Sequence, residues 1–268
     1  MSLTAVARPH HAEPPRCAPG ETAAPPVTGA VHSFDISTGV DGPGTRFVAF
    51  LAGCPLRCQY CHSPDTWYRR SGTPTTVDEL LTEIRRYERF IKVAGGGVTI
   101  SGGEPLQQPA FVREILTGCH EMGLHTALDT SGFLGDRADD ALLAVTDLVL
   151  LDIKSGLPGT YRTVTRTGAL EPTIRFAHRL GALGKPIWLR FVLVPGLTDD
   201  PANVAAVADI AAGVPTIERV EVLPFHRLGA NKYAQLGEPF PLAATEAPDA
   251  ALLDRVRNQF RERGLTVY

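Results

Sequence analysis

Residues 46–62 read RFVAFLAGCPLRCQYCH, an apolar and β-branched run that leads directly into a loop with three cysteines. Residues 46–51 have the short, nearly continuous apolar character of a strand that is buried on both faces. In α/β folds with parallel strands, ligands gather at the carboxyl ends of the strands. The stretch therefore predicts a parallel sheet whose C-terminal edge carries a functional site.

The same alternation of a short apolar run and a helical pattern continues along the chain. We predict further strands at 97–101, 125–129, 147–153, 186–194 and 219–223, and helices at 76–91, 110–122, 139–145, 172–183, 201–212 and 248–263. Thr76 and Glu79 have the spacing of a capping box at the first helix. Repeated βα units imply a parallel sheet with helices outside it. About six units are too few for an eightfold barrel, so we predict an α/β fold, a partial (β/α)6 barrel, with a doubly wound sheet as the alternative.

The composition narrows the class of protein and its partners. The chain has 268 residues, of which 44% are hydrophobic, and this is enough for one sizeable core. A net charge of −3 without a broad basic face argues against nucleic acid as a main partner. No stretch approaches the roughly 20 apolar residues of a membrane helix. Residues 1–29 are rich in Pro, Ala and Gly and contain no apolar signal-peptide core, so we expect a disordered tail followed by a single domain over 30–268.

The cysteines point to a metal cluster in a reducing cytoplasm. The chain has five, namely Cys17, Cys54, Cys58, Cys61 and Cys119, and this odd, crowded set is a poor disulfide framework. The C-x3-C-x2-C loop supplies three thiolates, which are soft ligands for iron–sulfur clusters or zinc. Three cysteines can hold three irons of a 4Fe–4S cube and leave the fourth iron open. Cys119 lies on a predicted helix, where a lone cysteine is usually a small buried hydrophobe.

Two other interpretations of the cysteine loop remain. A zinc knuckle would use His62 as the fourth ligand, but the adjacent Cys61 and His62 would have difficulty in sharing one tetrahedral ion. A redox C-x-x-C pair of Cys58 and Cys61 would leave Cys54 unexplained. The cluster is therefore the preferred hypothesis.

A second motif follows the second predicted strand, where the chain reads Gly102-Gly103-Glu104. Glycines permit positive φ angles and a close approach of the backbone to a ligand. Exposed backbone groups could then bind an ammonium or carboxylate group, and Glu104 could pair with a cation. Many βα turns carry two glycines, so a purely structural turn is the alternative.

The cysteine loop and the Gly-Gly-Glu turn together resemble the radical S-adenosylmethionine (SAM) superfamily. Further segments extend the likeness and are similar to the pyruvate formate-lyase-activating enzymes from about residue 30 to the end: VHSF (31–34), VDGPGTRF (40–47), DTW (65–67), LDTSGF (128–133), TDLVLLDIK (146–154), RFVLVPG (190–196) and LPFHRLG (223–229). No cysteine-rich insert lies between Cys61 and Gly102, which favours this minimal type over other activases. Pro64 and Pro105 depart from the pattern expected of it.

The resemblance implies a role for individual residues. Cys54, Cys58 and Cys61 would ligate the 4Fe–4S cluster. SAM would be bound by Tyr60, Cys61, His62, Gly102, Gly103, Glu104, Asp129, Asp152, Ile153, Lys154, Arg190 and His226. A monovalent cation would be held by Asp129, Thr130 and Asp152. Simpler roles stand beside these: the aspartates could cap helices, Lys154 could be a solvated charge, and His226 could be a surface turn residue.

The resemblance also implies the reaction, that of a formate C-acetyltransferase-activating enzyme. An electron from flavodoxin or ferredoxin would reach SAM through the cluster, and the adenosyl radical formed would take a hydrogen from the glycine loop of pyruvate formate-lyase. The cofactors perform the chemistry while the protein orients them. A monomer is expected. The alternatives are an activase of another glycyl radical enzyme, a small-molecule radical SAM enzyme and, from a different class, a non-catalytic zinc-binding interaction protein.

Overall fold

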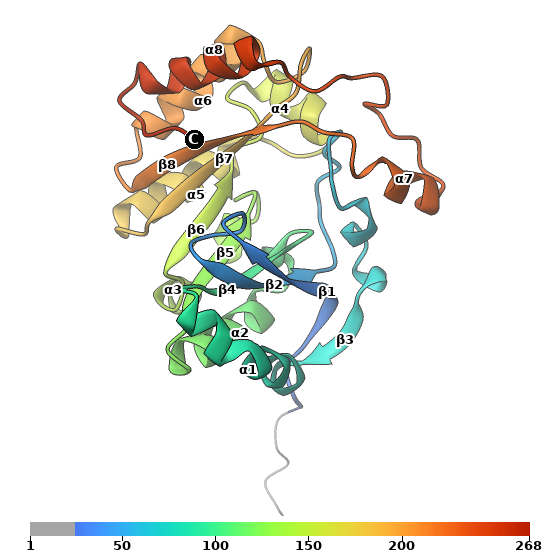
Figure 1. Ribbon diagram of the computed structural model, residues 1–268, viewed down its shortest axis with the longest axis vertical. Helices are drawn as coiled ribbons and strands as arrows, with labels where there is room; N and C mark the ends of the chain where they lie inside the picture. The colour runs from blue at the N-terminus through green and yellow to red at the C-terminus, as the bar shows by residue number, and fades with distance from the viewer. Residues whose placement is uncertain (1–24) are drawn as a thin grey trace, which may run out of the picture.

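The structure is a computed structural model that describes residues 25–268, and its centre is one eight-stranded sheet (Figure 1). Along the sheet the strands follow the order β3-β1-β2-β4-β5-β6-β7-β8. Their bounds are β1 (Thr28–Thr38), β2 (Thr45–Leu51), β3 (Thr73–Thr76), β4 (Gly97–Gly102), β5 (His125–Thr130), β6 (Leu148–Asp152), β7 (Ile187–Leu193) and β8 (Ile217–Pro224). The predicted tail 1–29 overlaps β1 by two residues, Thr28 and Gly29, and residues 1–24 of that tail lie outside the described residues.

The six strands β2 and β4 to β8 are parallel to their neighbours, and this confirms the partial (β/α)6 barrel. Two strands were not predicted. β1 pairs antiparallel with β2, and β3 pairs antiparallel with β1. These two strands extend the sheet beyond its parallel part, and β3 leads directly into α1 and from there to the parallel strand β4.

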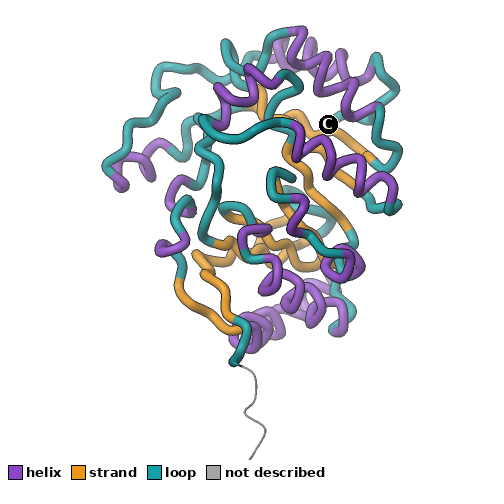
Figure 2. Tube along the Cα trace, turned by 180° about the vertical axis from the view of Figure 1, so that it is seen from behind, coloured by secondary structure: helices purple, strands orange, loops and turns teal. Residues whose placement is uncertain are grey.

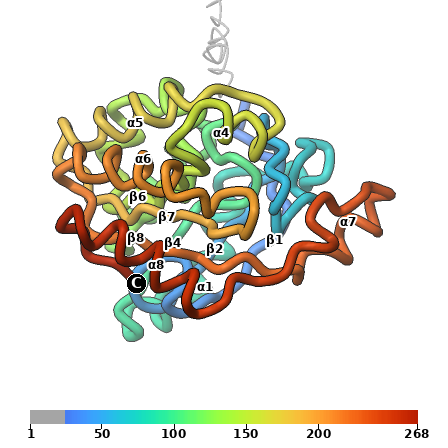
Figure 3. The backbone as a smooth tube through the Cα atoms, turned by 90° about the horizontal axis from the view of Figure 1, so that it is seen from above, coloured from blue at the N-terminus to red at the C-terminus, as the bar shows by residue number. Residues whose placement is uncertain are grey.

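Eight helices cover the outside of the sheet within residues 25–268 (Figure 2). They are α1 (Val77–Val93), α2 (Pro109–Glu121), α3 (Asp140–Ala144), α4 (Pro158–Thr165), α5 (Glu171–Ala182), α6 (Pro201–Ala212), α7 (Ala230–Leu236) and α8 (Ala250–Arg261). The predicted capping box is present, because Glu79 N donates to Thr76 Oγ1 at 3.2 Å and Thr76 N donates to Glu79 Oε2 at 2.7 Å. Of the eight helices, α4 and α7 were not predicted, and α7 lies at the edge of the molecule far from α5 and α6 (Figure 3).

Alternation along the strands separates a packed outer layer from the barrel interior. In β7, Phe191 and Leu193 belong to the main hydrophobic core under the helices, whereas Arg190 and Val192 line a cavity on the other face. The same division places Leu128 in the core and Asp129 at the cavity. The helices therefore hold the strands from outside and leave the inward side chains for the site.

The barrel is open between its first and last parallel strands, and other segments cover part of the opening. Residues 266–268 run beside β8, where Val220 N donates to the Thr266 carbonyl at 2.8 Å. The turn between β1 and β2 reaches β7, because Arg190 Nη2 donates to the Val40 carbonyl. No helix within residues 25–268 has both the length and the apolar character needed to cross a membrane.

Candidate functional site

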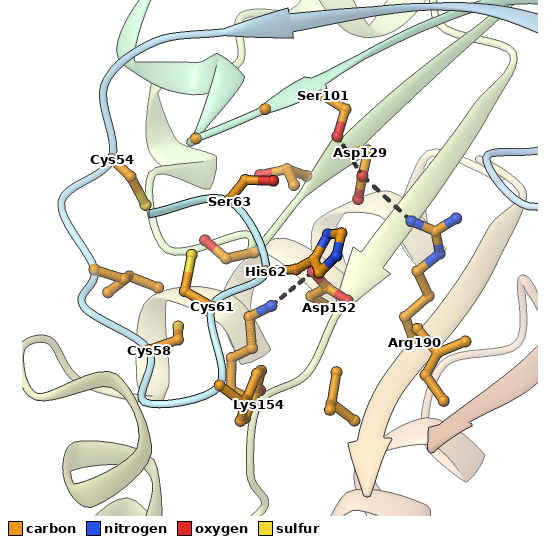
Figure 4. A pocket seen from close by; sticks show the side chains of 18 of the residues that line it. Cys54, Cys58, Cys61, His62, Ser63, Ser101, Asp129, Asp152, Lys154 and Arg190 are labelled. Carbon is orange, nitrogen blue, oxygen red and sulfur yellow. Dashed lines mark hydrogen bonds and ion pairs between the residues drawn. The ribbon is translucent and has the colours of Figure 1, made fainter. Parts of the chain in front are cut away.

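A cavity of about 340 Å³ opens at the carboxyl ends of the parallel strands, where the sequence placed the site (Figure 4). Its wall joins the cysteine loop to residues that follow five different strands. The lining residues are Cys54, Leu56, Cys58, Tyr60, Cys61, His62, Ser63, Ser101, Gly102, Gly103, Asp129, Thr130, Ser131, Asp152, Lys154, Arg190, Val192, Leu223, Pro224, Phe225 and His226. The structure thus brings together all the predicted site residues except two.

The cysteine loop is fixed from both sides. Arg57 N donates to the Thr165 carbonyl at 2.8 Å, and this bond anchors the loop on the end of α4. Cys54 N donates to the Trp67 carbonyl at 3.0 Å. Tyr233 Oη, from α7, donates to the Cys61 carbonyl at 3.2 Å. The backbone bonds hold the thiols on one wall of the cavity without using their sulfur atoms.

Burial disfavours the thiolate form of these three cysteines. It raises the pKa of Cys58 to about 12 and also raises the pKa values of Cys54 and Cys61. Within residues 25–268, no three His, Cys, Asp or Glu side chains are grouped so that they could hold a single metal ion. Three soft donors from one loop, each able to meet a different iron, nevertheless fit a cluster, because its positive irons offset the cost of thiolate burial.

The Gly-Gly turn lets β4 touch the cysteine loop. A Cβ atom on Gly103 would lie 2.3 Å from the Gly53 carbonyl oxygen, directly before Cys54. Gly102 has a φ of +114°, and its Cβ atom would lie 2.3 Å from Leu51 N. Both glycines are therefore required by a close approach of two backbones, in addition to any contact with a ligand.

Glu104 and Ile153 are the two predicted site residues that do not line the cavity. Glu104 is 1% exposed, and its carboxylate accepts hydrogen bonds from Leu106 N, Thr130 Oγ1, Ser131 N and Ser131 Oγ. Ile153 is fully buried in the main hydrophobic core. Both residues follow strands, but a side chain at a strand end can turn to either face.

Asp129 and Arg190 form the charged layer of the cavity. Arg190 Nη1 donates to Asp129 Oδ2 at 3.2 Å, and its Nε donates to Glu221 Oε2 at 3.3 Å. Ser101 Oγ donates to the same Asp129 oxygen at 2.6 Å. Burial raises the pKa of Asp129 to about 6, and Arg190 opposes that rise while Asp152 adds to it. Burial thus favours the neutral form of Asp129, and Arg190 favours its carboxylate.

Asp152 and Lys154 form a second ion pair at the end of β6. Lys154 Nζ donates to Asp152 Oδ2 at 2.7 Å. Burial alone would lower the pKa of Lys154, but Asp152 and neighbouring groups raise it well above its usual value. The Lys154 ammonium group lies 5.8 Å from the Tyr60 ring, whose buried hydroxyl has no hydrogen-bond partner within residues 25–268.

The predicted cation ligands converge only in part. Asp129 and Asp152 both line the cavity, as does Thr130. The Thr130 hydroxyl, however, donates to Glu104 Oε1 at 2.6 Å and accepts from Gly132 N at 3.0 Å. One carboxylate oxygen of each aspartate takes no part in the ion pairs described above. The two aspartates are therefore better placed than Thr130 to bind a cation.

Two histidines lie at the rim of the cavity. The rings of His62 and His226 meet edge to face, with their centroids 5.1 Å apart. Burial and the nearby charges of His226 and Lys232 lower the pKa of His62. Burial and these charges therefore favour the neutral ring of His62, which faces His226 at the cavity.

Sequence reasoning missed several residues of the wall. They are Leu56, Ser63, Ser101, Ser131, Val192, Leu223, Pro224 and Phe225. Inward alternation on β4, β7 and β8 could have found Ser101, Val192 and Leu223, because each lies an even number of residues from another inward position. The remainder belong to turns whose direction no periodicity indicates.

Comparison with known proteins decides the family. The model of the "Radical SAM superfamily" matches residues 48–207. The pyruvate formate-lyase-activating enzyme of Listeria monocytogenes is 42% identical over 229 residues, which cover 83% of this chain and 92% of the relative. The pyruvate formate-lyase 1-activating enzyme of Escherichia coli is 38% identical over 240 residues, covering 89% and 97%. This chain belongs to the radical SAM superfamily, among the pyruvate formate-lyase-activating enzymes.

Solved structures agree with this assignment. A domain of a pyruvate-formate lyase-activating enzyme from Bacteroides vulgatus has a TM-score of 0.55 at 26% identity and covers 65% of this chain and 98% of its own. A radical SAM methyltransferase from Sphaerobacter thermophilus has a TM-score of 0.62 at 18% identity, covers 87% of this chain and 71% of its own, and supports the fold alone. Radical SAM enzymes use a 4Fe–4S cluster and SAM, and membership in this superfamily decides against the non-catalytic zinc-binding alternative.

Proposed function

We propose that this radical SAM enzyme activates pyruvate formate-lyase by removing a hydrogen atom from a glycine of that protein. The observation that carries the proposal is that three cysteines of one loop share a cavity with two buried ion pairs. Its relatives named as activating enzymes support the choice of protein substrate. The glycine loop of pyruvate formate-lyase would enter at the rim, beside His62 and His226.

In this proposal each wall of the cavity has its own task. Cys54, Cys58 and Cys61 would hold the cluster, and the cavity beside them would hold SAM. When bound, the reduced cluster and SAM supply a 5′-deoxyadenosyl radical that can take a hydrogen from glycine Cα. Asp152 and Lys154 offer one acceptor and one donor group at the end of β6, suited to the hydroxyl and charged groups of SAM.

The charged layer would orient SAM in the cavity and keep water from competing. Arg190 is fixed by Asp129 and Glu221 and can present a guanidinium to a carboxylate. Asp129 and Asp152 would contribute the oxygens of the monovalent-cation site, with Thr130 as a weaker third ligand. Gly102 and Gly103 would bring the β4 backbone against the methionine part of SAM, while Glu104 supports that turn from behind and Ile153 packs in the main hydrophobic core.

The remaining partners follow from the chemistry. The cluster would receive its electrons from flavodoxin or ferredoxin, and the enzyme would act as a monomer. The three thiols of the loop require a reducing environment to remain free for iron, so we place the enzyme in the cytoplasm.

Electron paramagnetic resonance on the anaerobically reconstituted enzyme tests the proposal. The wild type, reduced with dithionite and mixed with SAM and pyruvate formate-lyase, should produce a glycyl doublet. Cys58→Ala should abolish the doublet, whereas Cys119→Ala should retain it, because Cys119 is fully buried on α2 outside the cavity. Cleavage of SAM without a glycyl signal would leave the superfamily intact and refute pyruvate formate-lyase as the substrate. If SAM is not cleaved and no cluster signal appears, the cysteine site is refuted.

A further inference from the structure

The outer side of the cysteine loop carries a basic surface that the cavity does not use. Side chains alternate along the loop, so that Cys54, Leu56 and Cys58 line the cavity whereas Arg57 does not. The C-terminal end of α4 and the turn after the loop add further positive charge. We call this surface the arginine face and define it as Arg57, Arg69, Arg70, Arg162 and Arg166, together with Tyr68.

Direct contacts hold the arginine face against the loop. The Arg57 guanidinium lies 5.1 Å from the centre of the Tyr68 ring, and the Arg70 guanidinium lies 4.3 Å from the same centre. Arg57 Nη1 also donates to the Cys54 carbonyl at 2.7 Å. Arg162 and Arg166 lie one turn apart at the end of α4, where the Thr165 carbonyl accepts from Arg57 N. Stacking therefore orders Arg57 and Arg70 at the centre of the face, and the α4 backbone places Arg162 and Arg166 beside them.

The charge of the arginine face is not neutralised by its surroundings within residues 25–268. Exposed arginines elsewhere, such as Arg175 and Arg179, pair with carboxylates, and the five arginines of the face form no such pair in the described part of the chain. Asp65, the carboxylate in the same segment, pairs with Lys232 at 3.1 Å instead. In a chain with a net charge of −3, the face is a local concentration of positive charge.

We propose that the arginine face is the docking surface for an acidic one-electron carrier protein that reduces the cluster. This rests on the proposed function, because only a redox cluster on the cysteine loop needs an external electron. The carrier loses one electron and the cluster gains it, and neither an atom nor a proton moves. A carrier docked here would be separated from the thiols only by the thickness of the loop, and electron transfer slows steeply with distance. The cavity rim stays free for the protein substrate.

Physical precedent favours such an interface. Electron-transfer encounters bury little area and are weak. Complementary charge mainly accelerates their association, by about 10-fold to 1,000-fold, and the acceleration is lost as salt is added. A stacked set of unpaired arginines suits this purpose better than a hydrophobic patch, because it attracts an acidic partner and releases it after one electron.

The test uses the full-length holoenzyme with two matched double variants. Arg70→Glu with Arg162→Glu reverses charge on both sides of Arg57, at exposed positions whose side chains form no hydrogen bond within residues 25–268. Arg85→Glu with Arg89→Glu makes the same change in charge on exposed residues of α1. Calorimetry measures the binding of an acidic flavodoxin, and then of an acidic ferredoxin, at low and high ionic strength. Stopped-flow absorbance measures cluster reduction by each reduced carrier and by dithionite.

The expected result is a loss of about tenfold or more in affinity and reduction rate for at least one carrier, confined to the R70E/R162E enzyme. Dithionite should reduce all three proteins equally, and the difference should vanish at high salt. Wild-type affinity for both carriers in R70E/R162E would overturn the proposal, as would an equal loss in R85E/R89E. A lower glycyl radical yield with dithionite in R70E/R162E alone would assign the face to the protein substrate instead. Absence of a glycyl radical in the wild type with dithionite would refute the proposed function, independently of carrier binding.

Discussion

At the scale of single residues, Glu104 has a structural task that its position did not reveal. Its carboxylate is buried beneath the β4 turn and accepts hydrogen bonds from Thr130, the last residue of β5, and from Ser131 directly after it. The residue therefore ties two neighbouring strand ends of the cavity together. Any contact with SAM would require this carboxylate to give up part of that network.

Replacing Glu104 with Gln tests this structural role. The amide has the same size as the carboxylate, but its NH2 group donates hydrogen bonds and would face N–H and O–H groups that need an acceptor. The free energy of unfolding should therefore fall by about 2 to 3 kcal/mol. Urea denaturation of the cluster-free protein, without SAM, measures the change. Unchanged stability together with lost SAM binding would instead restore Glu104 as a ligand.

A buried arginine makes the fold sensitive to acid. Arg46 is fully buried, and its Nη1 lies 2.9 Å from His125 Nδ1, which must accept this bond as a neutral ring. Burial and then Arg46 lower the pKa of His125 below its usual value. The unfolded chain therefore takes up a proton before the folded protein does, and stability should be lost as the pH falls from about 6.5 through the folded pKa.

The variant His125→Gln should remove this loss. Its amide oxygen can accept from Arg46 but does not titrate, so the midpoint of urea unfolding should vary less between pH 7 and pH 5 than in the wild type. An identical pH dependence in the two proteins would assign the acid sensitivity to other groups.

At the scale of elements, the contact between β4 and the cysteine loop depends on Gly103, which has no side chain. Gly103→Ala would place a methyl group 2.3 Å from the Gly53 carbonyl oxygen, so the loop must move. We expect a large loss of bound iron after reconstitution and a lower melting temperature. Gly159→Ala is the control, because a Cβ atom there meets nothing within 4 Å. Equal iron contents in both variants would contradict the role given to the close approach.

Elements also show how much the sequence could predict. The six parallel strands were visible because each is a short apolar run between helical patterns, and the cysteines were visible from their spacing. β1 was missed because its burial is uneven, and its sheet partners are decided by tertiary pairing. α4 and α7 are short helices within connecting segments, so their hydrophobic patterns gave little indication of a helix. The contact of Ile153 with SAM stays a prediction from the resemblance, because its side chain packs in the main hydrophobic core.

At the scale of the whole molecule, Arg190 on β7 contacts its ladder partner Glu221 and also reaches β5 and the turn between β1 and β2, which the ladder does not pair with β7. It contacts Asp129 on β5 and Glu221 on β8, and it donates to the Val40 carbonyl in the turn between β1 and β2. Its side chain is only 8% exposed. Arg190 therefore links the turn between β1 and β2 to the far part of the sheet across the open side of the barrel.

Arg190→Met should cost about 3 kcal/mol in unfolding free energy, because it leaves the largely buried Asp129 carboxylate without its cationic partner, whereas Glu221 keeps Arg219. Urea denaturation measures the loss, and hydrogen exchange should show faster exchange at the turn containing Val40 than along β4 and β5. Arg190→Lys keeps the positive charge but lacks the planar set of guanidinium N–H donors, so it should recover part of the stability. Equal stability of the Met variant and the wild type would show that the carboxylates find other partners.

The alternation along β7 and β8 has a consequence for how such a cavity can evolve. Val192 and Leu223 line it near the rim, while their neighbours Leu193 and Val222 belong to the outer core. Because neither residue belongs to the main hydrophobic core, mutations at the first pair can alter which molecule fits while that core and the charged layer keep their residues. Single substitutions at the mouth of the cavity can therefore change the substrate during evolution, while the residues that serve the radical chemistry stay the same.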